Sequence, residues 1–299
     1  MKFLIAGGTG FLGSALTKSL LVDKHQVFLL TRKPRPKIPV GAEAVQWDGK
    51  TTDGWGKLVN EMDAVIHVAG KSLSSWPWTA KKKRTFLDSR AIPGLVLAEA
   101  IRKATQRPRV FVQQSGINYY GLRGDLADES TPPGDDFLAQ LAVKWEAATK
   151  PIEDLGVRRV VTRTAVVLAR RGGLLPLMAL PVQLFVGGPM GTGQQAMPWI
   201  HLNDWVGAVR FLIENENARG GYNLVAPTPT SNAEFNRSLA KVLHRPYWFP
   251  IPAFLLRMVL GEMNVLLLEG RFSQPRRLVN SGYRFQFSGP YEAFADLYG

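Results

Sequence analysis

The first thirteen residues constrain the fold of this chain more than any other stretch does. Residues 3–6 form a short apolar run typical of a buried strand, and glycines separate it from the helical pattern of residues 14–22. Gly7, Gly10 and Gly13 have the spacing that lets a backbone approach a pyrophosphate and a helix pack closely on its strand. The helix N-terminus then offers free N–H groups to the phosphates. The stretch therefore predicts a dinucleotide-binding turn, with an ordinary glycine-rich turn as the alternative.

Two cations follow the next apolar run. Residues 26–31 form a second expected strand, which ends in Arg32 and Lys33. An NAD-binding chain usually has an acidic residue here to accept from the ribose hydroxyls, whereas an NADP-binding chain supplies a cation for the 2′-phosphate. The cation pair therefore predicts NADP(H) as the cofactor. The alternative is a solvated basic loop that continues to Lys37.

Strands and helices alternate through the first half of the chain. Further strands are expected at 42–47, 64–68, 109–114 and 158–168, with helices at 81–104 and 135–149. This alternation predicts an α/β fold with a doubly wound parallel sheet of the Rossmann type, in which ligands bind at the carboxyl ends of the strands. The cofactor contacts predicted from the first turn and from the strand ends are Gly7, Thr9, Gly10, Phe11, Leu12, Gly13, Asp48, Ala69, Gly70, Val166 and Val167.

The second half of the chain has a different pattern. Residues 172–198 are rich in glycine and proline, which predicts a loop that serves as a lid or crossover. A short strand is expected at 199–201, a helix that Asp204 caps at 205–214, and the last sheet strand at 221–225. From residue 231 the pattern predicts helices, a proline-rich linker and an aromatic tail. We therefore predict a Rossmann domain at 1–230 and a smaller C-terminal α/β substrate lobe at 231–299.

Composition excludes several classes of protein. The 299 residues include no cysteine, so disulfides and thiolate metal sites are excluded, and a reducing compartment such as the cytoplasm is expected. The four histidines are too dispersed for a metal signature, and we predict no metal site. Prolines or charges interrupt the apolar stretches 174–188 and 251–268, so no membrane span is predicted.

The net charge of +13 is compatible with nucleic acid, an anionic membrane or phosphorylated ligands as partners. Most of the charge is scattered along the chain. The one dense run is Lys81 to Arg84, and Thr79 just before it can cap a helix. We interpret the run as a solvated helix face, so no specific nucleic acid is expected as a partner.

Taken together, these residues resemble the extended short-chain dehydrogenases of the epimerase and dehydratase group. Within that group the chain is most similar to an atypical epimerase-like family, sometimes labelled a cell-division inhibitor, with a characteristic C-terminal domain. The resemblance implies a Rossmann core, bound NADP(H) with Arg90 among the contacts, and a small substrate lobe. The matching segments run nearly end to end: 7–13, 31–34, 68–70, 89–90, 119–121, 144–146, 163–168, 187–191, 199–201, 222–227, 252–261 and 268–270.

The chain departs from the working members of that group at the catalytic pair. In a Tyr-x-x-x-Lys pair the lysine lowers the tyrosine pKa so that the tyrosine exchanges a proton near neutral pH. None of the seven tyrosines has a lysine four residues later. Ser115, with Tyr119 or Tyr120, follows the fifth expected strand and could supply hydroxyls to a carbonyl; a turn serine beside packed aromatics is the alternative.

Lys144 is the candidate replacement for the missing lysine. It falls within an apolar stripe of its expected helix, between Leu141 and Ala148, and an inward lysine is costly unless it is paired or ligand-bound. Either it reaches the cofactor cleft or its stem runs along the stripe to water.

Two functions remain open from the sequence. The first is an NADP(H)-dependent oxidoreductase or epimerase-like enzyme that acts on a small carbonyl or sugar-like substrate. The second is a non-catalytic NADP(H)-binding or redox-sensing module, which the lost tyrosine–lysine pair favours. We expect a monomer or homodimer in either case.

Overall fold

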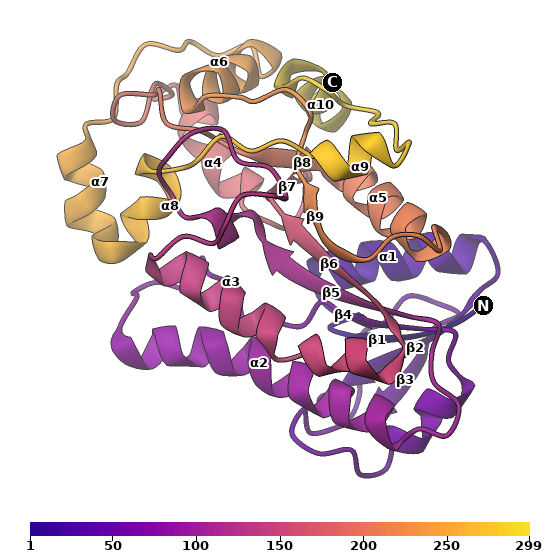
Figure 1. Cartoon of the computed structure of the whole chain (residues 1–299). Helices are drawn as coiled ribbons and strands as arrows, with labels where there is room; N and C mark the ends of the chain where they lie inside the picture. The colour runs from indigo at the N-terminus through magenta and orange to yellow at the C-terminus, as the bar shows by residue number, and fades with distance from the viewer.

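The computed structural model describes residues 1–299, and a parallel seven-stranded sheet with the order β3-β2-β1-β4-β5-β6-β9 forms its centre (Figure 1). A second, two-stranded parallel sheet pairs β7 with β8. The predicted doubly wound α/β fold is therefore confirmed. The strands are β1 (Lys2–Ala6), β2 (Gln26–Thr31), β3 (Glu43–Gln46), β4 (Ala64–His67), β5 (Val110–Gly116), β6 (Arg158–Thr164), β7 (Val166–Leu168), β8 (Trp199–His201) and β9 (Gly220–Leu224).

Strands β1, β2 and β4 are largely apolar because both faces of the sheet are buried. Successive side chains of a strand point to opposite faces. Phe3 and Ile5 of β1 pack into one core cluster, and Leu4 and Ala6 pack into the other. A parallel sheet covered on both faces favours apolar residues at successive positions, which is why these runs do not alternate with polar residues, whereas β5 and β6 also bury hydrogen-bonded polar side chains such as Gln113 and Arg163.

Helices cover the two faces of the sheet (Figure 1). The core cluster on one face includes α1 (Phe11–Val22) and α5 (Leu202–Glu214), which also contact each other. The other face carries α2 (Ala80–Lys103) and α3 (Phe137–Ala147). As predicted, Thr79 caps α2, because its side chain accepts a hydrogen bond from the Lys82 N–H. Single 3₁₀ turns complete the core: η1 (Gly56–Glu61), η2 (Ile117–Tyr120) and η3 (Lys150–Leu155).

The structure corrects three expectations for the second half of the chain. The single strand expected at 158–168 is two strands, because pairing changes at Ala165: its N–H donates to the Leu224 carbonyl, and the next N–H donates to the Pro198 carbonyl. The expected loop 172–198 contains a helix, α4 (Leu175–Gln183). The cap of α5 is His201 rather than Asp204, whose carboxylate accepts instead from the backbone of Gln286 and Phe287.

The chain after residue 231 is mostly helical, and its first and last helices pack on β7, β8 and α4. A capping box of Ser231 and Glu234 starts α6, and α10 packs against that helix through Phe294 and Phe235, whose ring centroids are 4.9 Å apart. As for membrane spans, the structure contains no helix with the length and apolar composition that a span requires. The elements of this segment are α6 (Asn232–Val242), α7 (Ala253–Leu260), η4 (Gly261–Asn264), α8 (Val265–Leu268), α9 (Arg276–Asn280) and α10 (Pro290–Tyr298).

Candidate functional site

The glycine turn between β1 and α1 is shaped so that only glycine fits at two positions. Gly7 has φ +91°, and a Cβ built on it would lie 2.6 Å from the Ala69 backbone nitrogen. A Cβ on Gly13 would lie 2.3 Å from the Gly7 carbonyl oxygen. Gly10 is the N-cap of α1, and no side chain caps the helix. The turn therefore leaves the positive end of a twelve-residue helix open to an anion.

The cleft in front of this turn has a volume of about 550 Å³. It is bounded by the turn glycines, by the segments after β4 and β5, and by the start of β7, so it opens at the carboxyl ends of the central strands. This is where a doubly wound sheet binds its ligand. The structure brings ten of the predicted site residues to the cleft: Gly7, Gly10, Phe11, Leu12, Gly13, Gly70, Arg90, Ser115, Val166 and Val167.

Arg90 is a buried cation in this cleft without a carboxylate partner. Its guanidinium donates from Nη1 to the Phe86 carbonyl at 3.0 Å and lies 5.0 Å from the centre of the Trp145 ring. Burial lowers the pKa of Arg90 to about 10, so the side chain is charged at neutral pH. Because an unpaired buried charge is costly, Arg90 favours an anionic ligand in the cleft.

Arg32 and Lys33 lie at the end of β2, outside the walls of the cleft. Both are exposed, and neither takes part in an ion pair. Asp48 is on the neighbouring turn, where its carboxylate accepts from the N–H groups of Lys50 and Thr51 at 2.7 and 2.8 Å. The first of these bonds is the largest of the effects that lower the pKa of Asp48. Asp48 thus stabilises its own turn and does not line the cleft, whereas the two cations are free to meet a phosphate.

Thr9 and Ala69 also lie outside the walls of the cleft. Thr9 lines a shallow depression between α1 and α5. Ala69 supports the glycine turn from behind, because its backbone is what a side chain at Gly7 would strike.

Ser115, at the end of β5, belongs to a polar network that reaches into the protein. Its hydroxyl donates to Oε1 of Glu146 at 2.8 Å. Arg163 donates to the same carboxylate twice, from Nε to Oε1 at 3.0 Å and from Nη2 to Oε2 at 2.9 Å. The side chains of Glu146 and Arg163 are 13% and 9% exposed, so this fork holds the carboxylate in one orientation behind Ser115.

The two candidate tyrosines support the same network rather than the cleft. The Tyr120 hydroxyl accepts from Arg163 at 2.9 Å and donates to Asn223 at 2.7 Å. Burial raises the pKa of Tyr120 to about 12, the opposite of what a catalytic tyrosine of a short-chain dehydrogenase needs. Tyr119 packs its ring 3.4 Å from the Arg163 guanidinium. Neither tyrosine lines the cleft.

The structure does not place Lys144 in the cleft. It is exposed on α3, while Leu138, Leu141, Ala142 and Trp145 form the buried face of that helix. The expectation that Lys144 reaches the cofactor cleft is therefore not met. Its exposure fits the alternative, in which the stem runs along the stripe to water.

Sequence reasoning missed Glu146 and the apolar half of the cleft. Glu146 lies in the matched segment 144–146, but its contact with Ser115 depends on the folded structure. This apolar lining comes from four separate parts of the chain, with Glu269 and a few polar residues such as Lys71 and Asn118 beside it. These apolar residues are Leu73, Leu122, Leu138, Leu141, Val265 and Leu266.

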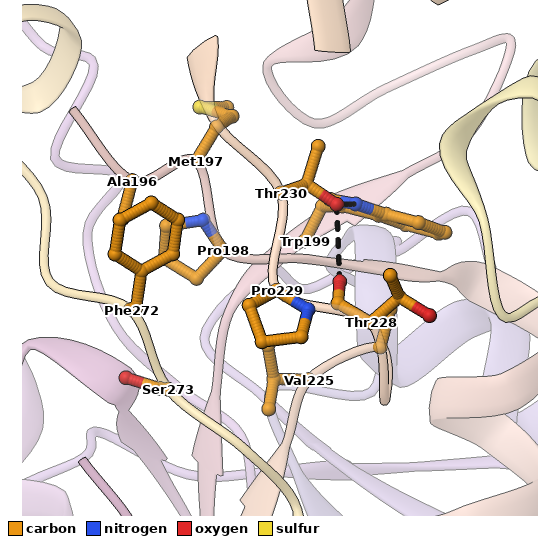
Figure 2. A pocket seen from close by; sticks show the side chains of 11 residues that line it. Ala196, Met197, Pro198, Trp199, Val225, Thr228, Pro229, Thr230, Phe272 and Ser273 are labelled. Carbon is orange, nitrogen blue, oxygen red and sulfur yellow. Dashed lines mark hydrogen bonds between the residues drawn. The ribbon is translucent and has the colours of Figure 1, made fainter. Parts of the chain in front are cut away.

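A small void adjoins the cleft at Ala196, Met197 and Pro198 (Figure 2). In Figure 2 the Thr230 hydroxyl bonds to the Thr228 carbonyl, and the same hydroxyl accepts from the indole nitrogen of Trp199. The void measures about 10 Å³, which is at most the space of a single water. The void is therefore too small for an organic ligand and does not extend the cleft.

Comparisons with known proteins agree with this geometry. The profile of the NAD dependent epimerase/dehydratase family matches residues 3–225, and a domain family of unknown function, DUF1731, matches residues 251–297. The epimerase family protein SDR39U1 of Bos taurus is 40% identical over 294 residues, which are 96% of each chain. The epimerase family protein YfhF of Bacillus subtilis is 36% identical over 96% of this chain and 95% of its own.

A solved structure extends the comparison to three dimensions. The crystal structure of human epimerase family protein SDR39U1 (isoform 2) with NADPH superposes with a TM-score of 0.90 at 36% identity. The match covers 99% of both chains. The sheet, the glycine turn and the C-terminal helices described above are therefore a shared architecture.

Proposed function

The chain belongs to the NAD-dependent epimerase/dehydratase family, and we propose that it binds NADP(H) and transfers hydride between it and an apolar carbonyl or alcohol. One observation carries the proposal. The glycine turn before α1 has no side-chain cap and opens onto a cleft that contains Arg90 without a carboxylate partner. Arg32 and Lys33 are exposed at the end of the next strand, β2.

The residues present fit a phosphorylated dinucleotide. The glycines leave room for a pyrophosphate at the N-terminus of α1, where a Cβ would close the turn. Arg90 offers its charge within the cleft, and Arg32 and Lys33 would hold the 2′-phosphate. The relative SDR39U1 from human was crystallised with NADPH, which supports the same choice here. When bound, the nicotinamide would supply or accept the hydride.

The protein's own contribution to the chemistry is a proton path from the cleft to a carboxylate. Because the Ser115 proton is directed at Glu146, the free lone pairs of Oγ are available to accept the hydroxyl proton of an alcohol in the cleft. As that proton moves to Oγ, the Ser115 proton passes to Oε1 of Glu146. Carbonyl reduction follows the same path in reverse. Arg163 keeps the carboxylate aimed at Ser115 throughout.

The lining of the cleft favours an apolar substrate over a nucleotide sugar. A sugar nucleotide needs cations for its diphosphate and hydrogen-bonding groups for its hydroxyls. Leucine and valine side chains make up much of the lining, beside a few polar residues such as Lys71 and Asn118, and the Glu269 carboxylate there is paired with Arg123. A ketone, enone or quinone with a ring or chain of carbon atoms matches these walls better.

Turnover tests the proposal. Wild type is incubated with NADPH and a panel of apolar ketones, enones, quinones and nucleotide sugars, and the loss of NADPH absorbance is followed. Ser115→Ala and Glu146→Gln should each lower turnover by roughly 10²–10⁴-fold, with NADPH affinity largely unchanged. Lys144→Met is the matched control, because Lys144 is on the same helix as Glu146 but faces water. Unchanged turnover in both site variants would refute the proton path.

The missing tyrosine–lysine pair supports a second candidate, a non-catalytic NADP(H)-binding or redox-sensing module. Firm NADPH binding without turnover of any compound in the panel would favour it.

Three further predictions concern the cytoplasmic location of the protein, its state as a monomer or homodimer, and the division of the chain at residue 230. Cell fractionation, analytical ultracentrifugation and limited proteolysis would check them in turn.

A further inference from the structure

One face of the C-terminal region exposes large apolar side chains. Residues 184–186 follow α4, and residues 248–249 precede α7, which itself has no buried residue. Trp248 and Met258 are 71% and 73% exposed, against the near-complete burial of such side chains in the core. We call these two segments and the exposed face of α7 the apolar patch. Single exposed apolar residues are ordinary, but a contiguous set marks an interaction surface.

Backbone hydrogen bonds make the patch one continuous surface. The Trp248 indole donates to the Phe185 carbonyl at 2.9 Å, and the Phe249 N–H donates to the Gly187 carbonyl at 3.1 Å. The Ile251 N–H donates to the Pro189 carbonyl at 2.9 Å, immediately before α7 begins. The two segments therefore run alongside each other. In Figure 1, α7 stands at the edge of the molecule, away from the central sheet.

Helix α7 presents apolar side chains and one arginine on its exposed surface, which is the pattern of a helix at a membrane–water interface. Phe254 and Met258 are one helical turn apart on the outer face, and Val259 beside them is also exposed. Arg257 is the charged residue of the helix, and it is exposed as well. Aromatic and aliphatic side chains with a neighbouring arginine are typical of helices that lie in the headgroup region of a bilayer.

The charged side chains of the patch itself are all positive. No Asp or Glu occurs from residue 155 to 203 or from 235 to 261, the two stretches that contain the patch. Arg245 and Arg257 are exposed in or beside it, and the Arg245 guanidinium lies 4.5 Å from the Phe185 ring. Glu262, which follows α7 in η4, is paired with Lys83. An apolar surface whose own charges are positive complements an apolar partner that carries anionic groups.

We propose that the apolar patch docks this protein on the surface of an anionic phospholipid bilayer. The apolar side chains enter the headgroup region, and the two arginines meet the lipid phosphates. A second copy of the chain fits less well, because a symmetric contact through the patch would bury the arginines of both copies and the patch has no carboxylate to pair with them. Docking does not depend on the proposed hydride transfer.

Vesicle flotation of the full chain tests the proposal. Wild type is mixed with vesicles of phosphatidylcholine alone or with phosphatidylglycerol added, and it should float with the anionic vesicles and release as salt is raised. The double variant Phe254→Asp with Met258→Asp should bind the anionic vesicles roughly tenfold more weakly or worse. The matched control is Val22→Asp with Val40→Asp, which puts the same charge on two exposed residues far from the patch. That control should bind nearly as wild type does.

A positional measurement supports the outcome. Brominated lipid should quench tryptophan fluorescence of wild type in anionic vesicles, and Trp248→Phe should remove most of that quenching while flotation persists. Circular dichroism confirms that each variant is folded. The proposal is overturned if wild type does not float with anionic vesicles, or if the control variant loses as much binding as the patch variant. If wild type is a dimer in solution and does not bind vesicles, and the patch variant is a monomer, the patch would be assigned to a second copy instead.

Discussion

At the scale of single residues, Arg32 should decide the choice of cofactor. Arg32→Asp should weaken NADPH binding and narrow its advantage over NADH by roughly tenfold or more, because a charge-assisted contact contributes about 1.5–3 kcal/mol. Titration of both cofactors by tryptophan quenching measures the change. Lys37→Asp, in the same exposed loop, is the matched control and should leave the ratio nearly unaltered. If Arg32→Asp leaves the preference intact, the cation is only part of a solvated loop.

His67 should make the protein less stable in mild acid. Burial, with a smaller effect of the Arg90 charge, lowers the pKa of His67 to about 4. Between pH 6.5 and 4 the unfolded chain binds a proton at this residue and the folded chain does not, so stability is complete above pH 6.5 and declines as pH falls. The loss reaches on the order of 3 kcal/mol.

Urea unfolding at several pH values measures this loss. His67→Asn should flatten the decline between pH 6.5 and 4, whatever its effect on stability at neutral pH. His244→Asn replaces an exposed imidazole and should preserve the slope. A wild-type stability that does not change over this range would contradict the assignment.

At the scale of elements, the Rossmann half was predictable because its signals are local. The predicted bounds of β2 match the structure residue for residue, and β1 and β4 differ by one residue at an end. Each is an apolar run that ends at glycine or charge, and both faces of the sheet are buried, so no neighbour alters the pattern. The turn residues at the cleft followed from the same local pattern.

The elements that sequence reasoning missed depend on distant partners. Nothing in the sequence marks the break at Ala165; the change of pairing from Leu224 to Pro198 causes it. Pro176 in the first turn of α4 is compatible with a helix, although prolines and glycines nearby favoured a loop. Glu146 could be placed behind Ser115 only once β5, β6 and α3 were brought together.

Helix α10 should contribute strongly to stability through one side chain. Phe294 is fully buried against Phe235 of α6, so Phe294→Ala should lower the free energy of unfolding by about 3–5 kcal/mol. Tyr291→Ala, on the exposed side of the same helix, should cost about 1 kcal/mol or less. Chemical denaturation of both variants gives the comparison, and equal losses would show that α10 is not anchored by Phe294.

At the scale of the whole molecule, the two sequence-defined parts share their cores. Leu278 of α9 is buried in the cluster under the central sheet, and Phe235 and Phe294 lie in one cluster with Trp199 of β8. Hydrogen bonds also cross between the parts. The Asn223 side chain donates to the Gln274 carbonyl at 3.0 Å.

A chain that ends at residue 230 should therefore not fold cooperatively by itself. It would expose the apolar clusters and leave the buried Asp204 carboxylate without the backbone donors of Gln286 and Phe287. Thermal unfolding followed by circular dichroism should show a single sharp transition for the full chain and a broad or absent one for 1–230. A sharp transition at the full-length temperature would show that the first part is an independent domain.

The edge position of β9 has a consequence for how the chain reaches this structure. β9 pairs with β6, yet β7, α4, β8 and α5 lie between them in the sequence. Arg277 at the start of α9, which donates to the Gly221 carbonyl of β9, is synthesised later still. Because pairings distant in sequence close slowly, we expect the edge of the growing sheet to stay open to other chains until β9 and α9 have been synthesised. We therefore expect the contact of α9 with β9 to protect the nascent chain from aggregation at this edge.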